Sequence, residues 1–457
     1  MRPRTVGVLG LARSGRAAAK LALSRGERVF ASDAGASAEI ESAAAEIRAL
    51  GGEAETGGHS VEKLAQCDVL IVSPGIPPQA EILRHPGLTG IPRVPELEYA
   101  FQNLAAPVLC VTGTNGKSTT TAQAAHLLQG AELDAPAAGN IGLALSEVAL
   151  RSEPPDWVVV EASSFQLAGI DTFAPRIGVV TNLSPDHLDR YSSVDEYYGD
   201  KARMFANASP SDVWVLNGED EAVRSLPGNA VGRRRYFRTE TPLPVEEDGG
   251  YVSADGSLTL RDEGKDAALV NVTELRVLGR HNWANALAAS IAALAAGAPH
   301  TAIVSGLRSF RGLAHRLEVV AEHDNVVWIN DSKATNISST RVALASMTRP
   351  TVLLLGGRHK GEPYTGLLDA MKDVVRIVIA YGEAGPGIVA DLGKHMSVAY
   401  VMGPFEDVVS TAARQARAGD AILLSPACSS FDMFRDYEER GRRFAELAIR
   451  HAEASHG

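Results

Sequence analysis

The sequence has few cysteines, and their arrangement excludes two classes of protein. Cys67, Cys110 and Cys428 are the 3 cysteines of the 457-residue chain, and no two of them form a Cys-x-x-Cys pair. An odd number of widely spaced cysteines favours neither a disulfide framework nor a zinc site. We therefore expect a protein of a reducing compartment, the cytoplasm.

The chain also lacks an excess of positive charge and long apolar runs. With 44 Lys and Arg against 55 Asp and Glu, its formal charge is −11, which opposes non-specific binding to nucleic acid or to acidic membranes. No stretch reaches the ~18 uncharged apolar residues that would span a bilayer. The first apolar run is followed at once by Arg13, Arg16 and Lys20, so we expect a strand there rather than a signal peptide.

Short apolar runs alternate with Ala- and Leu-rich stretches in three successive blocks, which is typical of α/β domains with parallel sheets. The sequence therefore predicts three domains: a Rossmann-like domain at 1–95, a central P-loop ATPase-like domain at 96–312 and a second Rossmann-like domain at 313–457. Residues 231–271 lack the alternation and predict a small β insertion in the central domain. The strands expected on apolar runs are 5–9, 28–32, 68–72, 107–112, 157–161, 177–181, 213–217, 326–330, 351–355, 376–380, 398–402 and 421–424. The helices we expect include 14–24, 38–50 and 282–296.

A phosphate-binding loop is the sharpest signal in the chain. The residues Thr112-Gly-Thr-Asn-Gly-Lys-Ser-Thr119 follow an apolar run and precede a helix. A strand, a glycine-containing loop and a helix N-terminus together present backbone N–H groups to phosphate. Lys117 then neutralises the β and γ phosphates and Ser118 offers its hydroxyl to Mg²⁺. The general pattern GxxxxGK[ST] requires Gly where this chain has Val111, but the strand, the loop glycines, the lysine and the hydroxyl residue are all present.

Two further polar segments follow strands of the same predicted sheet. Glu161 ends the run Trp157-Val-Val-Val160 and would bring a carboxylate beside the phosphate loop, although such an acid also serves as a helix cap. The loop 184–190 contains His187 between Asp186 and Asp189. An imidazole with carboxylates would hold a hard cation, while a lone histidine is often structural.

The first domain has the glycines of a nucleotide-binding turn in an incomplete pattern. Gly7 lies in the first expected strand, Gly10 and Gly15 follow it, and Asp33 closes the second strand, but Ala12 stands where GxGxxG requires glycine. Anion capture at a helix N-terminus fits both a dinucleotide and a UDP-sugar. A nucleotide-linked oxidoreductase and a P-loop switch protein without ligation therefore stay open on the residues alone.

At this point the motifs resemble those of the ATP-dependent Mur ligases and the related folylpolyglutamate synthetases. The phosphate loop reads TGTNGK[ST] in that family, as it does here, and the resemblance continues through the motifs at 161–167, 182–190, 279–282, 315–316 and 330–336. It covers essentially the whole chain and implies an amide-forming enzyme with three α/β domains. The motifs at 10–15 and 425–432 are most similar to those of the member that adds D-glutamate to UDP-N-acetylmuramoyl-L-alanine in peptidoglycan synthesis. The resemblance implies an acyl-phosphate intermediate, and we expect a monomer; a sister ligase with another amino acid is the nearest alternative.

The resemblance also implies roles for residues of the central and third domains. It makes Lys201 a lysine carbamylated by CO₂, where the chain alone would indicate an exposed helical lysine, and Asn140 a catalytic residue rather than an ordinary turn residue. Two Mg²⁺ sites are implied, with Ser118, Glu161, His187 and carbamylated Lys201 as ligands. The implied catalytic residues are Lys117, Asn140, His187 and Lys201. The implied ATP contacts are Gly113, Thr114, Asn115, Gly116, Lys117, Ser118, Thr119, Asn282, Asn285, Arg316, Asp331 and Lys333.

The two remaining substrates are assigned by the same resemblance. The UDP-sugar contacts are Leu11, Ala12, Arg13, Ser14, Ser32 and Asp33, and the D-glutamate contacts are Thr335, Lys360, Ser430, Phe431 and Tyr437. Lys360 ends an apolar strand and would equally suit a solvated loop. The family often has Phe where Tyr437 stands. Because Arg316, Asp331 and Lys333 are far in sequence from the phosphate loop, we expect the third domain to close over ATP.

Overall fold

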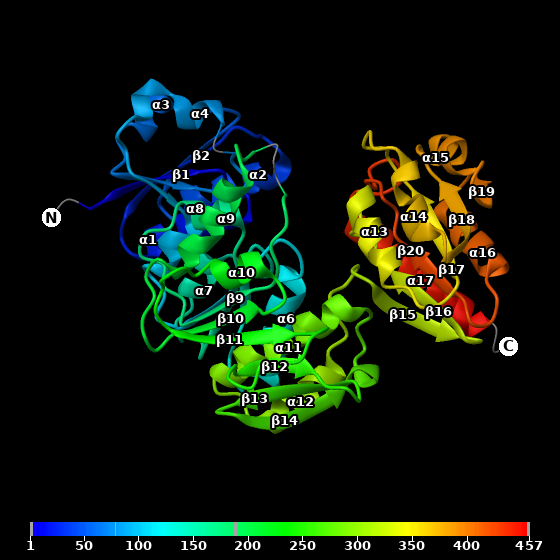
Figure 1. The fold of residues 1–457 in the computed structure, drawn as a ribbon. Helices are drawn as coiled ribbons and strands as arrows, with labels where there is room; N and C mark the ends of the chain where they lie inside the picture. Colours follow the sequence, from blue (N-terminus) through cyan, green and yellow to red (C-terminus); the bar gives the residue numbers. More distant parts are fainter. Residues whose placement is uncertain (1–2, 78, 187–189, 455–457) are drawn as a thin grey trace. The chain divides into compact units, whose positions relative to one another are not determined.

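The structure, a computed structural model, describes residues 3–77, 79–186 and 190–454. Its chain divides into two compact units (Figure 1). Unit 1 comprises Met1–Val272 with Ala284–Leu307, and unit 2 comprises Thr273–Trp283 with Arg308–Gly457. Unit 1 contains two sheets and unit 2 one, which confirms the predicted α/β class. The predicted domain limits at 95 and 312 stay predictions.

The N-terminal sheet of unit 1 is fully parallel, with strand order β3-β2-β1-β4-β5. Helices fill both faces: one core includes Val8, Ala18 and Ile47, and the other Leu9, Phe30 and Leu70. The strand order reverses between β1 and β4, and ligands of such sheets bind at that reversal, beyond the carboxyl ends of the strands. The elements are β1 Thr5–Leu9, α1 Arg13–Ser24, β2 Arg28–Asp33, α2 Ala38–Ala49, β3 Glu53–Thr56, α3 Val61–Leu64, β4 Val69–Val72, α4 Glu81–Arg84, β5 Arg93–Pro95 and α5 Glu96–Phe101.

The central sheet has nine strands in the order β14-β13-β12-β11-β10-β9-β6-β8-β7. It is parallel from β7 to β12, and only β13 and β14 run antiparallel to their neighbours. The expected β insertion therefore extends the central sheet instead of forming a sheet of its own. The elements are β6 Val108–Thr112, α6 Lys117–Gly130, β7 Ala137–Gly139, α7 Leu145–Ala149, β8 Val158–Glu161, α8 Ser164–Ala168, β9 Ile177–Val180, α9 Val194–Ala202, β10 Val213–Asn217, α10 Glu221–Ser225, β11 Arg233–Arg238, β12 Gly249–Val252, β13 Ser257–Asp262, β14 Lys265–Asn271, α11 Arg280–Ala295 and α12 His300–Ser309.

The sheet of unit 2 has six strands in the order β15-β16-β20-β17-β18-β19. β15 pairs antiparallel with β16, and the other pairs are parallel. Its two faces bury separate apolar cores, one around Leu353 and Leu423 and the other around Trp328 and Phe444. The elements are β15 Glu318–His323, β16 Val326–Asn330, α13 Ile337–Ala345, β17 Thr351–Gly356, α14 Leu368–Met371, β18 Val375–Tyr381, α15 Gly385–Leu392, β19 Val398–Val401, α16 Phe405–Gln415, β20 Ala421–Leu424 and α17 Tyr437–Ala454.

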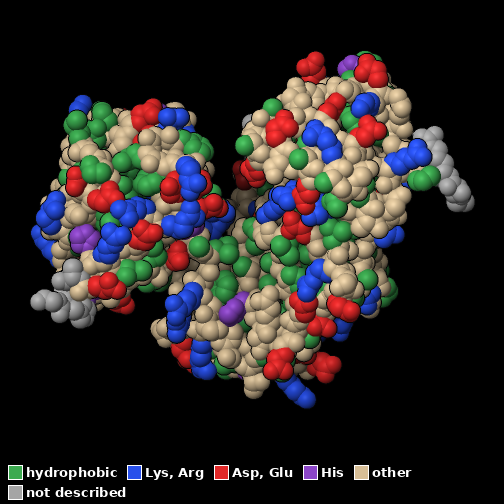
Figure 2. Space-filling model, turned by 180° about the vertical axis from the view of Figure 1, so that it is seen from behind, with side chains coloured by type: hydrophobic (Ala, Val, Ile, Leu, Met, Phe, Trp, Pro, Cys, Tyr) green, Lys and Arg blue, Asp and Glu red, His purple; other side chains and the backbone are tan. Residues whose placement is uncertain are grey.

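The surface carries charges of both signs. Figure 2 shows Lys and Arg side chains interspersed with Asp and Glu over the visible face of each unit. Across the described parts of the chain, every helix is too short or too polar to cross a membrane.

Candidate active site

The phosphate loop lies between β6 and α6, in the middle of the central sheet. β6 pairs with β8 on one side and β9 on the other, so three parallel strands end around the loop. Gly116 precedes α6 with a φ of +81°, and a Cβ there would lie 2.5 Å from the Asn285 Oδ1 atom. The 14-residue helix then begins at Lys117, so its first N–H groups lie at the loop.

Thr181 and Asn182, which follow β9, hold the phosphate loop in place by hydrogen bonds to the backbone atoms of the loop. The Thr114 N–H donates to the Asn182 carbonyl at 2.8 Å, and the Asn115 N–H donates to Asn182 Oδ1 at 2.9 Å. The Thr181 hydroxyl donates to the Asn115 carbonyl at 2.6 Å, and Lys117 Nζ donates to the Thr114 carbonyl at 2.8 Å. Asn182 was not among the predicted site residues. Its position directly after an apolar strand is the sequence feature that would have indicated it.

Glu161 ends β8 and is fully buried, with 1% of its surface exposed. Asn140 Nδ2 donates to Glu161 Oε1 at 2.8 Å, and the Asn140 N–H donates to the Glu161 carbonyl at 3.0 Å. Glu161 Oε2 is buried without a hydrogen-bond partner among the described residues. A buried carboxylate oxygen left in this state is a suitable ligand for a hard cation.

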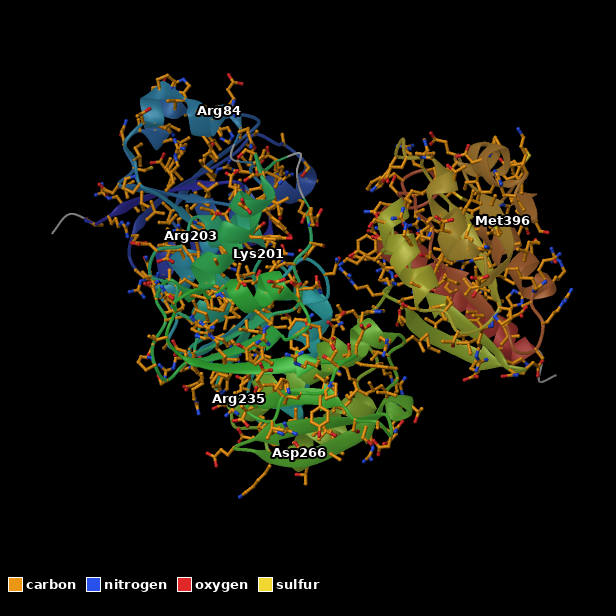
Figure 3. All side chains as sticks on the ribbon, in the orientation of Figure 1. Arg84, Lys201, Arg203, Arg235, Asp266 and Met396 are labelled. Carbon is orange, nitrogen blue, oxygen red and sulfur yellow. The ribbon has the colours of Figure 1, made fainter. Side chains whose placement is uncertain are left out.

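Lys201 belongs to α9 and is labelled in Figure 3. Its side chain is buried, and its Nζ donates to the Gly113 carbonyl at 2.8 Å and lies 4.4 Å from the centre of the Tyr197 ring. Burial and the positive charge of Lys117 lower the pKa of the Lys201 ammonium to about 7. The alternative of an exposed helical lysine is therefore excluded.

The predicted metal site is only partly visible. His187 and Asp189 lie outside the described residues. Among the residues that are described, no three His, Cys, Asp or Glu side chains form a cluster that would hold a metal ion. Ser118 is buried at the start of α6, and Glu161 lies opposite Val111 in the pairing of β8 with β6.

The predicted UDP-sugar residues lie at the carboxyl ends of β1 and β2. The Asp33 carboxylate accepts hydrogen bonds from the Leu11 N–H at 2.6 Å and the Gly35 N–H at 2.7 Å, so it fixes both loops. Ser32 is fully buried and donates to Glu55 at 2.7 Å, which favours a supporting role over direct contact. Ala12 and Ser14 lie at the start of α1, where a Cβ on Gly15 would come within 1.7 Å of the Gly10 carbonyl oxygen.

Arg13 connects this loop to the central sheet. Its guanidinium donates to the Gly142 carbonyl at 2.6 Å and to the Gly139 carbonyl at 3.2 Å, on either side of Asn140. A cavity of about 530 Å³ borders Leu11, Arg13 and α1. The structure thus brings the predicted sugar-nucleotide loop next to a predicted catalytic residue.

Unit 2 contains its own group of predicted nucleotide contacts. Asp331 follows β16 and is buried, and it accepts hydrogen bonds from the Ser425 hydroxyl at 2.8 Å and the Leu317 N–H at 3.3 Å. Burial raises the pKa of Asp331 to about 7, against the opposing effects of these hydrogen bonds and of Arg316. The Lys333 ammonium lies 5.5 Å from the centre of the Tyr437 ring. Tyr437 thus lies beside one predicted ATP residue, Lys333.

The predicted D-glutamate residues come from three loops of unit 2 and from the start of α17. Lys360 Nζ donates to the Thr335 hydroxyl at 3.2 Å. Ser430 is buried, whereas the Phe431 side chain is 62% exposed. The structure thus brings Thr335 and Lys360 together, and their contact with D-glutamate stays a prediction.

Comparison with known proteins gives matches over nearly the whole chain. Residues 5–82 match the MurD N-terminal domain, residues 111–293 the Mur ligase middle domain and residues 315–428 the Mur ligase, glutamate ligase domain. The chain is 41% identical to the UDP-N-acetylmuramoylalanine–D-glutamate ligase of Salinibacter ruber over 96% of both chains. It is 38% identical to the ligase of the same name from Pelotomaculum thermopropionicum, over 97% of this chain and 96% of the relative. The chain belongs to the Mur ligase family.

Solved structures support the fold of this Mur ligase. The UDP-N-acetylmuramate-alanine ligase MurC of Thermotoga maritima matches 98% of the chain, and 99% of its own, with a TM-score of 0.61 at 20% identity. A pseudomurein peptide ligase type C from Methanothermus fervidus matches 97% of the chain, and 99% of its own, with a TM-score of 0.58 at 18% identity. The family and fold predicted from the motifs are therefore confirmed.

Helix α11 is divided between the two units, and each part carries one predicted ATP contact. Asn285, in unit 1, accepts a hydrogen bond from the Thr120 hydroxyl at 3.1 Å and lies against Gly116. Asn282, in unit 2, donates through Nδ2 to the Leu278 carbonyl at 2.7 Å. The individual ligand contacts of these residues stay predictions.

Proposed function

We propose that this Mur ligase joins D-glutamate to UDP-N-acetylmuramoyl-L-alanine with consumption of ATP, a step in the synthesis of peptidoglycan precursors. The observation that carries the proposal is the phosphate loop of β6 and α6, bordered by Glu161 and Lys201, in a chain whose curated relatives bear the name of that ligase. The prediction from the sequence agrees with those names.

The reaction needs an activated carboxylate, because a free carboxylate resists attack by an amine. The γ-phosphoryl group of ATP is first transferred to the alanyl carboxylate, giving ADP and an acyl phosphate. The amine of D-glutamate then attacks the carbonyl carbon: the C–N bond forms, the C–O bond to phosphate breaks, and inorganic phosphate leaves with the amine's proton released to solvent. Lys117 and the first N–H groups of α6 hold the transferring phosphoryl group.

Glu161, Ser118 and the proposed carbamate of Lys201 are the groups on described residues that would hold Mg²⁺ at this loop. The buried Glu161 Oε2 atom has no hydrogen-bond partner among the described residues, and its carboxylate is an oxygen ligand of the kind Mg²⁺ prefers. When bound, the cation neutralises charge on the phosphates. Asn140 fixes the Glu161 carboxylate through Oε1 and leaves Oε2 for this purpose.

Lys201 is proposed to carry a carbamate. A neutral amine adds to CO₂ and loses one proton, and the lowered pKa of about 7 leaves much of Lys201 neutral near neutral pH. The product is an anionic oxygen group beside Gly113, where an ammonium would repel a cation. The same burial that lowers the pKa of the lysine therefore favours its conversion to a ligand.

Substrate binding is divided between the loops described above. Arg13 and the loops fixed by Asp33 are proposed to hold the UDP-sugar, and Thr335 and Lys360 a carboxylate of D-glutamate. A cation and a hydroxyl 3.2 Å apart suit recognition of a carboxylate.

Phosphate release from ATP tests the proposal. Purified protein is given UDP-N-acetylmuramoyl-L-alanine with D-glutamate, L-glutamate, D-aspartate or L-alanine in turn, and release is expected with D-glutamate alone. Lys117→Ala is expected to abolish release while the protein stays folded, because the variant removes the charge that acts on the phosphates.

Lys265→Ala is the control, since Lys265 lies exposed in β14 of the same sheet. Equal turnover by Lys117→Ala and Lys265→Ala would refute the phosphate-loop assignment. Release that is independent of the amino acid would indicate a switch protein or hydrolase, and release with another amino acid would indicate a sister ligase.

A further inference from the structure

The loop that carries Lys360 is attached on one side to the loop after β20. The Arg358 N–H donates to the Ser429 carbonyl at 2.9 Å, and the Ser429 N–H donates to the Arg358 carbonyl at 3.2 Å. These two bonds form an isolated antiparallel bridge next to Ser430 and Phe431. The bridge ends at Arg358, so it leaves the next two residues, His359 and Lys360, to be held by other contacts.

A chain of three side chains provides such a contact. His359 Nδ1 and the Tyr364 hydroxyl are 2.9 Å apart, and the Tyr364 hydroxyl and Cys428 Sγ are 3.0 Å apart. The His359 and Tyr364 rings also pack with their centres 5.3 Å apart. The chain thus connects the residue before Lys360 to the residue before Ser429.

Both Tyr364 and Cys428 are buried in the core of unit 2. The Tyr364 N–H donates to Asp391 Oδ2 of α15 at 2.9 Å, which fixes the tyrosine backbone as well as its hydroxyl. Burial and the neighbouring Cys428 raise the pKa of the Tyr364 phenol well above its usual range, so the phenol keeps its proton. A buried phenol of this kind needs hydrogen-bond partners, and His359 and Cys428 supply them.

Cys428 is itself held rigidly by α17. Arg440, which is fully buried, donates from Nη1 and Nη2 to the Cys428 carbonyl at 3.2 Å each. The same guanidinium donates to the Ser332 carbonyl at 2.8 Å and, from Nε, to the Ser332 hydroxyl at 2.9 Å. Arg440 therefore fixes the loop after β20 relative to the loop that leads from Asp331 to Thr335.

We infer that Tyr364 and His359 are positioning residues for the incoming amino acid, and that they act through Lys360. The inference rests on the proposed function. The hydrogen-bonded chain to Cys428 sets the place of the Lys360 ammonium next to the Thr335 hydroxyl, where the two bind a carboxylate of D-glutamate. Arg440 fixes the Cys428 end of this hydrogen-bonded chain. Displacement of His359 at the opposite end therefore moves Lys360 and leaves the predicted ATP residues of unit 2 in place.

Tyr364→Phe tests this role, because it keeps the ring and removes only the hydroxyl. We expect the KM for D-glutamate to rise about fivefold, the loss typical of one hydrogen bond, while kcat and the KM for ATP change by less than about twofold. A merely structural defect would lower the folded fraction, which reduces the apparent kcat and leaves every KM unchanged. The split between the two KM values therefore distinguishes positioning from destabilisation.

His359 provides a second and independent measurement. His359→Ala is expected to raise the KM for D-glutamate as much as Tyr364→Phe does. His359→Asn, whose amide places a polar atom near the position of Nδ1, is expected to restore the wild-type KM to within about twofold. Because both residues act through one chain, the double variant His359→Ala/Tyr364→Phe should be no worse than either single variant.

Tyr400→Phe is the control, since it makes the same chemical change in β19 of the same unit, on a side chain 40% exposed. An unchanged KM for D-glutamate in Tyr364→Phe, or additive effects in the double variant, would overturn the positioning role alone. Absence of D-glutamate-dependent phosphate release by the wild-type protein would overturn the proposed function as well, and it is seen before any variant is compared.

Discussion

Single buried polar groups determine the chemistry that the central sheet offers. Glu161 and Lys201 are each buried, yet neither belongs to an ion pair described for this chain: the carboxylate accepts from an amide and the ammonium donates to a carbonyl. Charged groups are rarely buried without a pairing partner or a metal ion. Their placement therefore supports the proposed cation and the proposed carbamate of Lys201.

Lys201→Ala is expected to lower the ligation rate by on the order of 100-fold, because a proposed metal ligand is lost. Acetate or formate at high concentration should restore part of the rate by occupying the place of the carbamate, whereas Lys201→Arg should show no rescue. Phosphate release with and without these acids measures the effect. Unchanged turnover in Lys201→Ala would contradict the carbamate.

The pH dependence of the ligation rate provides a second test of the carbamate on Lys201. The pKa of Lys201 lies near 7, so below that pH the amine is protonated and cannot add CO₂, and the rate of the wild-type protein should fall as the pH drops below 7. In Lys201→Ala rescued by formate, this acid limb should be absent, because the pKa of formic acid is far lower.

At the scale of elements, the phosphate loop depends on two neighbours that are distant in sequence. Asn182 accepts a hydrogen bond from the backbone of the loop. The Asn285 side chain lies so close to residue 116 that only glycine fits there. Gly116→Ala is expected to destabilise the protein by about 1–2 kcal/mol, since it combines a positive φ with a contact of 2.5 Å, and to raise the KM for ATP. Denaturant unfolding and phosphate release measure the two effects.

Gly130→Ala is the matched comparison, because Gly130 ends the same helix in open space with an ordinary φ. It should leave the KM for ATP unchanged and stabilise the protein by about 0.5 kcal/mol. A similar KM for ATP in both variants would argue against a specific demand for glycine at residue 116.

The elements predicted from the sequence were those with apolar runs. The strands at 5–9, 213–217, 326–330 and 421–424 have the predicted bounds, because each is a largely buried apolar strand with at least one parallel neighbour. β3, β5, β7 and β15 were missed: β3 reads Glu-Ala-Glu-Thr, β5 contains a proline, β7 has only three residues, and β15 is half polar. All four lie at a sheet edge, where one side needs no apolar partner and the sequence carries little periodic signal.

Residues of the candidate site could be predicted where they belong to local sequence motifs. Residues that support the site through contacts with distant parts of the chain could not be predicted. Lys117 and Glu161 follow strands that the sequence showed, and the structure places them at neighbouring strand ends. Arg440 and Tyr364 carry no such signal, because a single arginine in an amphipathic helix and a tyrosine at the start of a short 3₁₀ helix are ordinary surface features until tertiary contacts bury them. Their roles depend on contacts across 64 to 108 residues of chain.

At the scale of the whole molecule, the predicted substrate contacts divide between the two units. All predicted contacts of the UDP-sugar, from Leu11 to Asp33, lie in unit 1, and all those of D-glutamate, from Thr335 to Tyr437, lie in unit 2. Only ATP has predicted contacts in both, at the phosphate loop and at Arg316, Asp331 and Lys333. Each unit has its own apolar cores, so each is expected to open with its own free energy.

Hydrogen exchange measured by mass spectrometry tests this division. A ligand present at 100 times its Kd stabilises the state that binds it by about 2.7 kcal/mol, so amides that exchange through opening of that unit should slow by about 100-fold. UDP-N-acetylmuramoyl-L-alanine alone should slow such amides in unit 1, in β1 and β2 above all, and leave the β17 and β20 amides of unit 2 unchanged. D-glutamate alone should do the reverse, with Lys360→Ala as the control that removes its effect. Slower exchange of β17 and β20 with the sugar nucleotide alone would contradict the division, because that ligand has no predicted contact in unit 2.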